Sequence, residues 1–308
     1  MLPSSFSLRR SIRRLGGSLL DSLTYFDLLA ARLERSNTSG ESKDKVPYSP
    51  DKVLIYAIFC SDCQELESRI SDVLPIVTEF DLVLLMNSGT LEYQKPLPTG
   101  VELITRENKA RDLGSYRDAL LQIDLDVVTE LVLVNDSVHW FEGSLASFIN
   151  GARLTDFEIT GITQSQQKNP HIQSFAIHFK LSSLEMLYPI QSVRNWKLKR
   201  TLVAHGERNF SQWWTKNNFR FGPLYLTTQL EANSFDYLSV YGSDGSTLKK
   251  LSSSKVDLNP SIHYWVGLLL NARIIKKSLL RDNPAKFSNS PKTVLEAQAI
   301  LARLRKVD

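Results

Sequence analysis

The sequence predicts an α/β fold in which helices cover a parallel or mixed β-sheet. Short apolar runs alternate with segments whose apolar residues recur at helical spacing. The expected elements are, in order, a strand at 53–59, a helix at 65–80, strands at 81–86 and 101–104, a helix at 115–123, and a strand that ends at Asn135. This β-α-β-β-α-β order belongs to the class of sheets that bind ligands at the carboxyl ends of their strands.

Each expected element has its own pattern. The strands are continuous apolar runs, which indicate burial on both faces of a sheet. In the first helix, Leu66, Ile70, Val73 and Val77 fall on one face. The second helix follows a charged loop, and Ser115 could serve as its N-cap. A further strand is expected after Gln173, where apolar and polar residues alternate.

Length and composition fit an ordinary globular protein. The chain has 308 residues, 42% of them hydrophobic, which is enough for a sizeable core. The formal charge of +4 indicates a mild preference for anionic partners and does not imply nucleic acid. We expect a basic amphipathic segment at 1–35, a linker at 36–50, a main domain at 51–286 and a C-terminal helix at 287–308.

The first 35 residues combine a helical apolar stripe with a cluster of arginines. The stripe contains Leu8, Ile12, Leu15, Leu19, Leu23, Phe26 and Leu33, and the arginines are Arg9, Arg10, Arg13 and Arg14. Such a helix could lie on anionic lipid headgroups, or it could pack against its own domain or a partner protein. Because no membrane span or signal-peptide core is visible, we expect a cytoplasmic protein with peripheral contact to the inner face of the cell membrane.

The cysteines Cys60 and Cys63 form a C-x-x-C pair after the first expected strand. This spacing is compatible with dithiol redox chemistry or with half of a zinc site. There is no second cysteine pair, and the sequence C-S-D-C lacks the aromatic residue and Gly-Pro of a redox motif. The favoured interpretation is two free thiols in a reducing cytosol.

Polar residues with binding chemistry follow the strand that ends at Asn135. Asn135, Asp136 and Ser137 can bind a phosphate, a metal or a sugar, although the same residues also suit a plain strand-to-turn junction. The loop before the second helix carries Arg111 and Asp112, and a loop of this kind leading into a helix can bind a diphosphate. The alternative for the loop is a charged turn with a helix cap.

A second set of polar residues precedes the strand expected after Gln173. His171, Gln173 and Ser174 have side chains suited to a hydroxyl-rich ligand. As a lone histidine, His171 is more often an ordinary hydrogen-bonded residue than a ligand or a base.

Several separated segments resemble the rhamnan synthesis protein F family of polysaccharide glycosyltransferases. The segments are N-K-A-R-D-L-G-S-Y-R-D-A-L, L-V-L-V-N-D-S-V, T-G-I-T-Q-S with H-I-Q-S-F, N-P-x-x-x-x-W from Asn259 and I-K-x-x-L-L-R-D-N-P from Ile275. They occur in the family's order over residues 52–286. The agreement of several motifs in one order is more specific than any single motif.

The resemblance implies a GT-A-like, Rossmann-type sheet that binds a nucleotide-sugar donor. It places the donor against Asn108, Arg111, Asp112, Gly114, Ser115, Asn135 and Ser137. It places Asp136 at the position of a D-x-D motif, which binds the sugar and a divalent cation such as Mg²⁺ or Mn²⁺. The segment offers one carboxylate where hard cations prefer several oxygen ligands, so the metal stays an open question.

The resemblance also implies catalytic and acceptor residues. Glu207 heads a segment similar to the one that carries the base of inverting GT-A enzymes, and its alternative role is that of a helix-start glutamate. His171, Gln173, Ser174 and His263 are the acceptor or sugar candidates.

The last motif of the resemblance, which begins at Ile275, contains several basic residues. Lys276, Lys277 and Arg281 could attract a diphosphate or a lipid headgroup, and the default interpretation is a solvated basic helix.

The sequence therefore predicts a glycosyltransferase that moves rhamnose or a related sugar from a nucleotide-sugar donor to a growing glycan. The acceptor is expected to be a lipid-linked cell-surface polysaccharide or O-antigen, and the transfer to proceed with inversion. The alternative from another class is a non-catalytic glycan- or nucleotide-sugar-binding subunit of a polysaccharide assembly complex. Enzymes that share one fold transfer many different sugars, so the nucleobase of the donor stays open.

Overall fold

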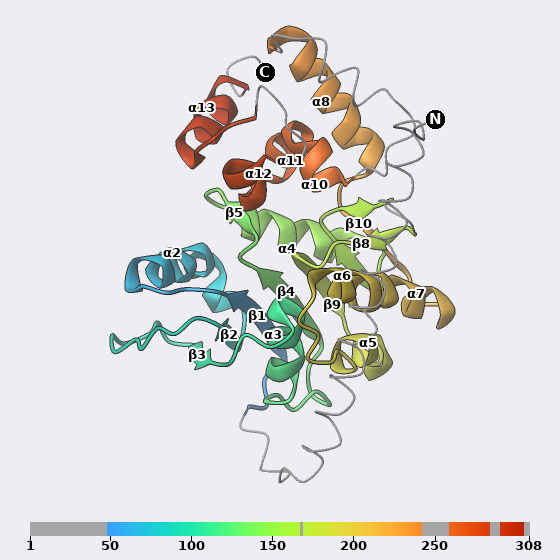
Figure 1. Ribbon diagram of the computed structural model, residues 1–308. Helices are drawn as coiled ribbons and strands as arrows, with labels where there is room; N and C mark the ends of the chain where they lie inside the picture. The colour runs from blue at the N-terminus through green and yellow to red at the C-terminus, as the bar shows by residue number, and fades with distance from the viewer. Residues whose placement is uncertain (1–47, 167–168, 242–258, 284–289, 305–308) are drawn as a thin grey trace, which may run out of the picture.

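A computed structural model describes residues 48–166, 169–241, 259–283 and 290–304 (Figure 1). The expected N-terminal helix at 1–35 and nearly all of the linker lie outside these residues. No helix within the described ranges has the length and apolar character needed to cross a membrane.

The centre of the described chain is a seven-stranded sheet with the strand order β10-β6-β9-β4-β1-β2-β3. Its strands are β1 (Lys52–Ile58), β2 (Leu82–Asn87), β3 (Val101–Thr105), β4 (Glu130–Asn135), β6 (Ile159–Gly161), β9 (Ala176–Lys180) and β10 (Phe221–Pro223). Only β9 runs antiparallel to its neighbours in this sheet. The predicted class, a mixed Rossmann-type sheet flanked by helices, is confirmed.

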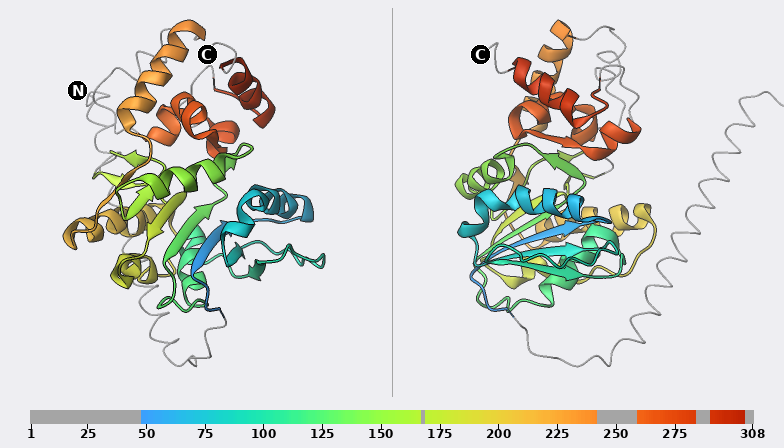
Figure 2. Two further views of the ribbon diagram at one scale, coloured as in Figure 1. Left: turned by 180° about the vertical axis from the view of Figure 1, so that it is seen from behind. Right: turned by 90° about the vertical axis from the view of Figure 1, so that its left-hand side faces the viewer.

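Helices cover both faces of the sheet, as the edge-on view in Figure 2 shows. One face packs against α2 (Cys63–Val73), α4 (Ser144–Leu154) and α11 (Trp265–Ala272). The other packs against α3 (Arg111–Leu120) and α7 (Arg208–Lys216), together with the short helix α5 (Tyr188–Gln191).

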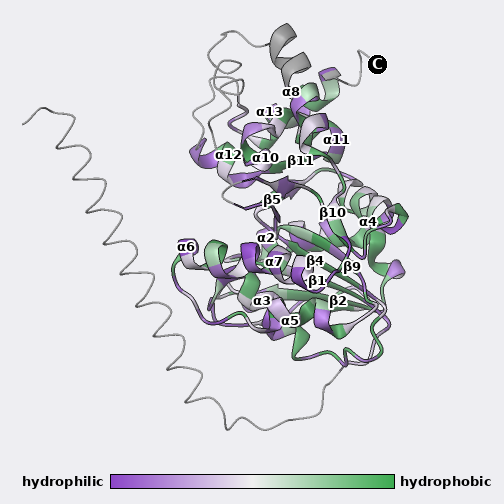
Figure 3. Cartoon of the chain, turned by 90° about the vertical axis from the view of Figure 1, so that its right-hand side faces the viewer, coloured by the Kyte–Doolittle hydropathy of each residue, from purple (hydrophilic) through white to green (hydrophobic). Residues whose placement is uncertain are grey.

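The strands are apolar on both faces for this reason. In β1, Leu54 and Tyr56 belong to the first layer, and Val53 and Ile55 belong to the second, all fully buried. Figure 3 shows the hydrophobic residues gathered in the central strands. Burial of both faces explains why the predicted strands read as continuous apolar runs rather than alternating ones.

Two predicted helices have different limits in the structure. Helix α2 ends at Val73, and a 3-10 helix (Leu74–Glu79) takes over, because Pro75 lacks the backbone N–H that a continuing α-helix needs. Helix α3 begins at Arg111, so the prediction of Ser115 as its N-cap is wrong. Ser115 lies inside the helix, and its hydroxyl donates a hydrogen bond to the Arg111 carbonyl at 3.3 Å.

The C-terminal part of the chain returns to the sheet through a two-stranded ribbon. Strand β11 (Ile274–Lys276) pairs antiparallel with β5 (Val138–Trp140), which follows β4 directly. The pairing sets Lys276 opposite Val138. The short helix α12 (Lys277–Asp282) therefore lies beside β5, as Figure 1 shows.

The remaining helices, strands and turns complete the described residues. They are β7 (Gln164–Ser165), β8 (His171–Ile172), the 3-10 turn Leu184–Leu187, α6 (Lys199–Leu202), the π-helical turn Val203–Glu207, α8 (Thr227–Tyr241), α10 (Pro260–His263) and α13 (Val294–Leu304). Helix α13 occupies the central part of the segment 287–308, for which a C-terminal helix is expected.

Candidate functional site

A cavity of about 790 Å³ opens at the carboxyl ends of the central parallel strands. Phe59 follows β1, Ser88 follows β2, and Asp136 follows β4, and all three residues line the cavity. The other walls come from the start of α3, from residues 196–207 and from residues 276–281. Parallel strands bring their carboxyl ends to one edge of the sheet, so this is the place where a ligand site was expected.

Most of the residues predicted for the site meet at this cavity. Those that line it are Asn108, Arg111, Asp112, Ser115, Asn135, Asp136, Ser137, Ser174 and Glu207. They come from four separate parts of the chain, residues 108–115, residues 135–137, Ser174 and Glu207, and the fold brings them together.

The predicted acceptor residues other than Ser174 lie elsewhere. Gln173 is buried and donates hydrogen bonds to Asn259 Oδ1 at 3.1 Å and Ser261 Oγ at 3.2 Å. His263 accepts a hydrogen bond from the Asn259 backbone at 2.9 Å, and the imidazole of His171 is 3% exposed. Gln173 and His263 thus contact the start of α10, His171 contacts the Asn169 carbonyl, and none of the three residues lines the cavity.

Gly114, which was predicted to contact the donor, is buried behind the wall formed by α3. A Cβ atom at this position would lie 2.0 Å from the Lys109 carbonyl oxygen. The glycine is therefore needed for the loop to pass close over the first turn of the helix, and its contribution to the site is indirect.

The turn after β4 fixes the polar groups at the strand end. The Asn135 amide donates a hydrogen bond to the Asp112 carboxylate, and its oxygen accepts the backbone N–H of Ser137 at 3.0 Å. Asp136 Oδ2 accepts the Phe59 backbone N–H at 3.3 Å and lies 3.5 Å from Lys277 Nζ. The turn is thus an Asx-type turn whose next carboxylate faces the cavity.

The entry to α3 has an unusual backbone. Ala110 and Arg111 have φ angles of 56° and 51°, in the left-handed region that non-glycine residues rarely adopt. Such residues cost of the order of 1–3 kcal/mol each and cluster at binding sites. Both residues line the cavity, so the strain belongs to the part of the wall that presents Asp112.

Arg106 holds this entry in place, and sequence reasoning missed it. Its guanidinium donates hydrogen bonds to the Lys109 carbonyl at 2.7 Å and to Ser115 Oγ at 3.2 Å, and it forms an ion pair with Asp118 at 2.8 Å. Arg106 comes directly after β3, so the rule that singled out Asp136 after β4 could have found it.

Burial and a neighbouring carboxylate change the ionisation of Asp112. Burial, and then the charge of Glu207, raise the pKa of Asp112 to about 6, while the cation of Lys276 and nearby backbone N–H groups oppose the shift. A carboxyl group with this pKa can exchange a proton near neutral pH, which is typical of functional sites.

Glu207 reaches the cavity from a π-helical turn. The turn Val203–Glu207 joins α6 to α7, and Glu207 directly precedes α7, as its sequence suggested, but its side chain does not cap the helix. Ser174 Oγ donates a hydrogen bond to the Glu207 carboxylate. Ser174 is held in turn by the Tyr116 hydroxyl, which donates to its carbonyl at 3.0 Å. Such π-turns are frequent at functional sites.

The wall next to Asp136 and Ser137 is cationic. Lys276 Nζ donates a hydrogen bond to Ser137 Oγ at 2.9 Å and lies 4.6 Å from the centre of the Phe175 ring. Burial lowers the pKa of Lys276 to about 8, while Glu207 and Asp112 oppose this effect. Lys277 lines the same wall, so the expectation of a plain solvated basic helix does not describe the two lysines. It does describe Arg281, which also lines the cavity but has a side chain that is 77% exposed and paired with Asp282.

A further stretch of the wall was not predicted. Trp196, Lys197 and Lys199 line the cavity. The Trp196 side chain is 6% exposed, and its indole N–H has no hydrogen-bond acceptor within the described part of the chain. The signal was present in the sequence, where this tryptophan stands among basic residues in R-N-W-K-L-K-R.

The C-x-x-C pair does not form a redox site in this structure. Cys60 is buried and Cys63 is exposed, and both are free thiols. Burial, followed by the charge of Asp136, raises the pKa of Cys60 to about 12, which disfavours the reactive thiolate. In the described ranges no three or more His, Cys, Asp or Glu side chains gather as a metal site would require.

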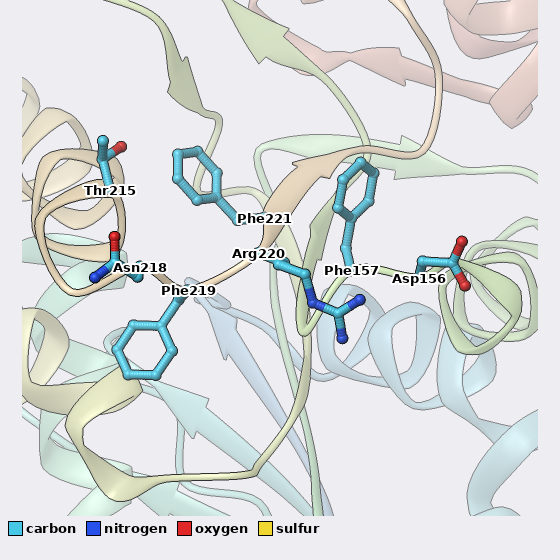
Figure 4. A pocket seen from close by; sticks show the side chains of 7 residues that line it. All are labelled: Asp156, Phe157, Thr215, Asn218, Phe219, Arg220 and Phe221. Carbon is cyan, nitrogen blue, oxygen red and sulfur yellow. The ribbon is translucent and has the colours of Figure 1, made fainter.

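A second hollow of about 420 Å³ lies at the β10 edge of the sheet (Figure 4). Its lining residues are Asp156, Phe157, Thr215, Asn218, Phe219, Arg220 and Phe221. None of the residues predicted for the site belongs to it. The larger cavity is therefore the candidate functional site.

Comparisons with known proteins give distant likenesses. No protein-family model matches the chain. Two sequences of the virulence protein VirA of Vibrio anguillarum are each 24% identical over 237 residues, which cover 71% of this chain and 75% of the relative.

Among solved structures, the chain is similar to a glycosyltransferase, the mannosyltransferase PcManGT from Pyrobaculum calidifontis in complex with GDP-Man and Mn²⁺. The TM-score is 0.34 with 14% identity, and the match covers 94% of this chain and 86% of that one. A likeness at this level does not assign an activity, a donor or a metal to the present chain. Membership in the rhamnan synthesis protein F family stays a prediction.

Proposed function

We propose that the protein is a nucleotide-sugar-dependent glycosyltransferase. The observation that carries the proposal is the meeting of Asp136, Asp112 and Glu207 at one cavity that Lys276 and Lys277 also line. A cationic wall suits a diphosphate, and carboxylates suit sugar hydroxyls and proton transfer. The position at the carboxyl ends of parallel strands is the usual one for a nucleotide.

In this proposal Glu207 is the general base. As the acceptor oxygen bonds to the anomeric carbon, the bond from that carbon to the donor phosphate breaks, and its electron pair stays on the phosphate oxygen. Glu207 takes the proton of the acceptor hydroxyl, and attack from the face opposite the leaving group inverts the anomeric centre. The hydrogen bond from Ser174 Oγ orients the carboxylate. The Asp112 carboxylate accepts a hydrogen bond from the Asn135 amide, which fixes its orientation. In this proposal the oriented carboxylate binds a sugar hydroxyl.

The finer assignment rests on the sequence resemblance. We propose rhamnose or a related sugar as the transferred group and a growing, lipid-linked cell-surface polysaccharide or O-antigen as the acceptor. A cytoplasmic enzyme at the inner face of the membrane would have access to both a soluble donor and an anchored acceptor. The basic amphipathic pattern of residues 1–35 supports peripheral contact with the membrane.

Replacement of Glu207 by Gln tests the base. We expect the Glu207→Gln variant to lose transfer by about 100-fold or more, since general-base catalysis contributes about 10²–10⁴-fold. Donor binding, measured by calorimetry, should change little because the amide keeps the shape of the side chain. The matched control is Glu102→Gln, which alters an exposed glutamate on β3. Undiminished transfer by the Glu207 variant would contradict the assignment.

A non-catalytic binding subunit is the second candidate. The turn after β4 favours it, because Asn135 and Ser137 flank a single carboxylate at the sugar-binding position. Donor binding without transfer to any acceptor, and without slow hydrolysis of the donor, would support this candidate over the enzyme.

A further inference from the structure

The turn after β4 is poorly suited to a divalent cation. Asp136 supplies the one carboxylate of the turn, and the Asn135 oxygen already accepts two hydrogen bonds from Ser137. Mg²⁺ and Mn²⁺ prefer several oxygen ligands, and no cluster of metal-binding side chains occurs in the residues the structure describes. The donor set of this site does not fit a tightly held metal ion.

Lys277 already occupies the position beside this carboxylate. Its ammonium nitrogen lies 3.5 Å from Asp136 Oδ2. A divalent cation on Asp136 would have to displace Lys277 or tolerate a like charge at short range, which is unfavourable. The ion pair thus places an organic cation where a metal ion would otherwise neutralise a phosphate.

In the β5–β11 ribbon, both Lys276 and Lys277 are hydrogen-bonded to Ser137. Ser137 accepts a hydrogen bond from Lys276 Nζ through its hydroxyl, and from the Lys277 backbone N–H, at 3.0 Å, through its carbonyl. Lys276 Nζ also lies over the Phe175 ring, which favours a cation. Both ammonium groups are therefore held at defined positions on the cavity wall before any ligand enters.

The Lys276 ammonium has unused binding capacity. It has three N–H donors, and among the described residues Ser137 is the one hydrogen-bond acceptor that it contacts. Burying a cation is costly unless it is paired and hydrogen-bonded. A ligand that supplies anionic oxygen atoms at this wall would satisfy the remaining donors.

We propose that Lys276 and Lys277 bind the donor diphosphate directly and without a divalent cation. Asp136 then acts as a positioning residue that holds the Lys277 ammonium. When the anomeric carbon–oxygen bond breaks, the electron pair stays on the β-phosphate oxygen, and the two ammonium groups stabilise that charge. This inference rests on the proposed function, because it assumes a nucleotide-sugar donor.

Calorimetric binding of UDP, GDP and dTDP to the full chain tests the inference, with excess EDTA in one series and Mn²⁺ in the other. We expect at least one of the three to bind in EDTA with an affinity within about threefold of that in Mn²⁺. The Lys277→Ala and Lys276→Met variants should each bind it at least about tenfold more weakly in EDTA, in line with a charge-assisted contact worth about 1.4 kcal/mol. The Lys277→Arg variant should recover most of the affinity, because the charge is kept.

A charge-removal control and a folding control complete the design. Lys95→Ala removes an exposed lysine that pairs with Glu67 on the surface of the protein, and it should leave the affinity unchanged. The Lys277 side chain is 38% exposed, so its variant is expected to keep the melting temperature of the wild type even if Lys276→Met does not fold.

The possible results separate the inference from the proposed function. Binding that is seen with Mn²⁺ and lost in EDTA would overturn the inference and leave a metal-dependent glycosyltransferase in place. Unchanged affinity of both lysine variants would also overturn it. Absence of binding of all three nucleotides in both series would overturn the proposed function, and the inference with it.

Discussion

The Asp112 carboxyl group is held in an environment that disfavours its charged form. Its pKa of about 6 lies above the ordinary value of 3.8, mainly because of burial. Between these two values the folded protein binds a proton more readily than the unfolded chain does. The free energy of unfolding therefore falls as the pH rises through this window, and the loss is complete above about pH 6.

The Asp112→Asn variant should remove this loss. We expect its free energy of unfolding at neutral pH to exceed that of the wild type by of the order of 2 kcal/mol, and the difference to vanish below about pH 4. Urea unfolding across this pH range measures both quantities. The exposed Asp126→Asn is the control and should show no change. A variant that is less stable at neutral pH would show that the charge of Asp112 stabilises the fold.

A site residue could be predicted from the sequence where a polar side chain directly follows an expected strand. Asp136 stands after an apolar run, so its position at the cavity could be expected from the sequence. His171 carries suitable chemistry, but its imidazole nitrogen is hydrogen-bonded to the Asn169 carbonyl at 2.8 Å, away from the cavity. Residue type alone does not show where a side chain points.

At the scale of elements, an ionic clamp joins β4, β9 and α4. Glu130 at the start of β4 lies 2.8 Å from His178 Nε2 on β9 and 2.7 Å from Arg153 Nε on α4. Burial acts to raise the pKa of Glu130, but hydrogen bonds from His178 and Arg153 outweigh it and lower this pKa to about 2. The clamp ties the antiparallel strand to the parallel part of the sheet.

The Glu130→Gln variant should therefore be less stable at neutral pH, by about 1–3 kcal/mol, since hydrogen bonds to a charged group are lost. In the wild type the folded pKa is lower than the ordinary value of 4.5. The stabilisation is present in full above about pH 4.5 and is lost as the pH falls toward 2, so the variant should show a flatter acid response. Urea unfolding at several pH values measures this difference.

Glu79 provides a matched comparison, because it forms an ion pair with the same Arg153 from a more exposed position. Glu79→Gln should lose less than about 1 kcal/mol, as expected for a surface ion pair. Equal losses in the two variants would show that burial of Glu130 does not strengthen the clamp.

Element boundaries depended on local details that periodicity does not report. The apolar stripe continued past Val73, and Pro75 ended the α-helix there. The π-helical turn around Gly206 has only five residues, so it gives no periodic pattern of apolar residues from which it could be predicted. A Cβ at Gly206 would lie 2.4 Å from Leu113 Cδ1, so tight contact with α3 sets the position of this turn. That contact is tertiary, and the sequence of the segment does not contain it.

At the scale of the whole molecule, the basic amphipathic segment at 1–35 predicts binding to membranes. We expect the full chain to float with anionic vesicles in a density gradient and a shortened chain that begins at Pro50 to stay behind. Neutral vesicles and higher salt should weaken the flotation of the full chain, because the arginines act through charge. Equal flotation of the two chains would remove the membrane role of this segment.

The parallel core of the fold could be predicted because its signals are local. Each of the strands β1, β2 and β4 is a continuous apolar run, and β9 follows from alternation. The three-residue strands β6 and β10 are too short to show a period. The β5–β11 pairing joins residues that are distant in the sequence, so the sequence of 276–281 alone predicts a solvated basic helix and not a cavity wall.

The β5–β11 ribbon also determines when, during synthesis on the ribosome, the polypeptide can form the complete donor site. Ser137 and Lys276 are separated by 139 residues, so the ribosome releases the strand-end turn and Glu207 long before the lysines that the site requires. A chain that ends before β11 would carry these carboxylates without Lys276 and Lys277, and Arg111, Lys197 and Lys199 would be its remaining cations at the cavity. Under the proposed mechanism, donor capture therefore waits until synthesis has passed α12, and truncated products do not consume activated sugar.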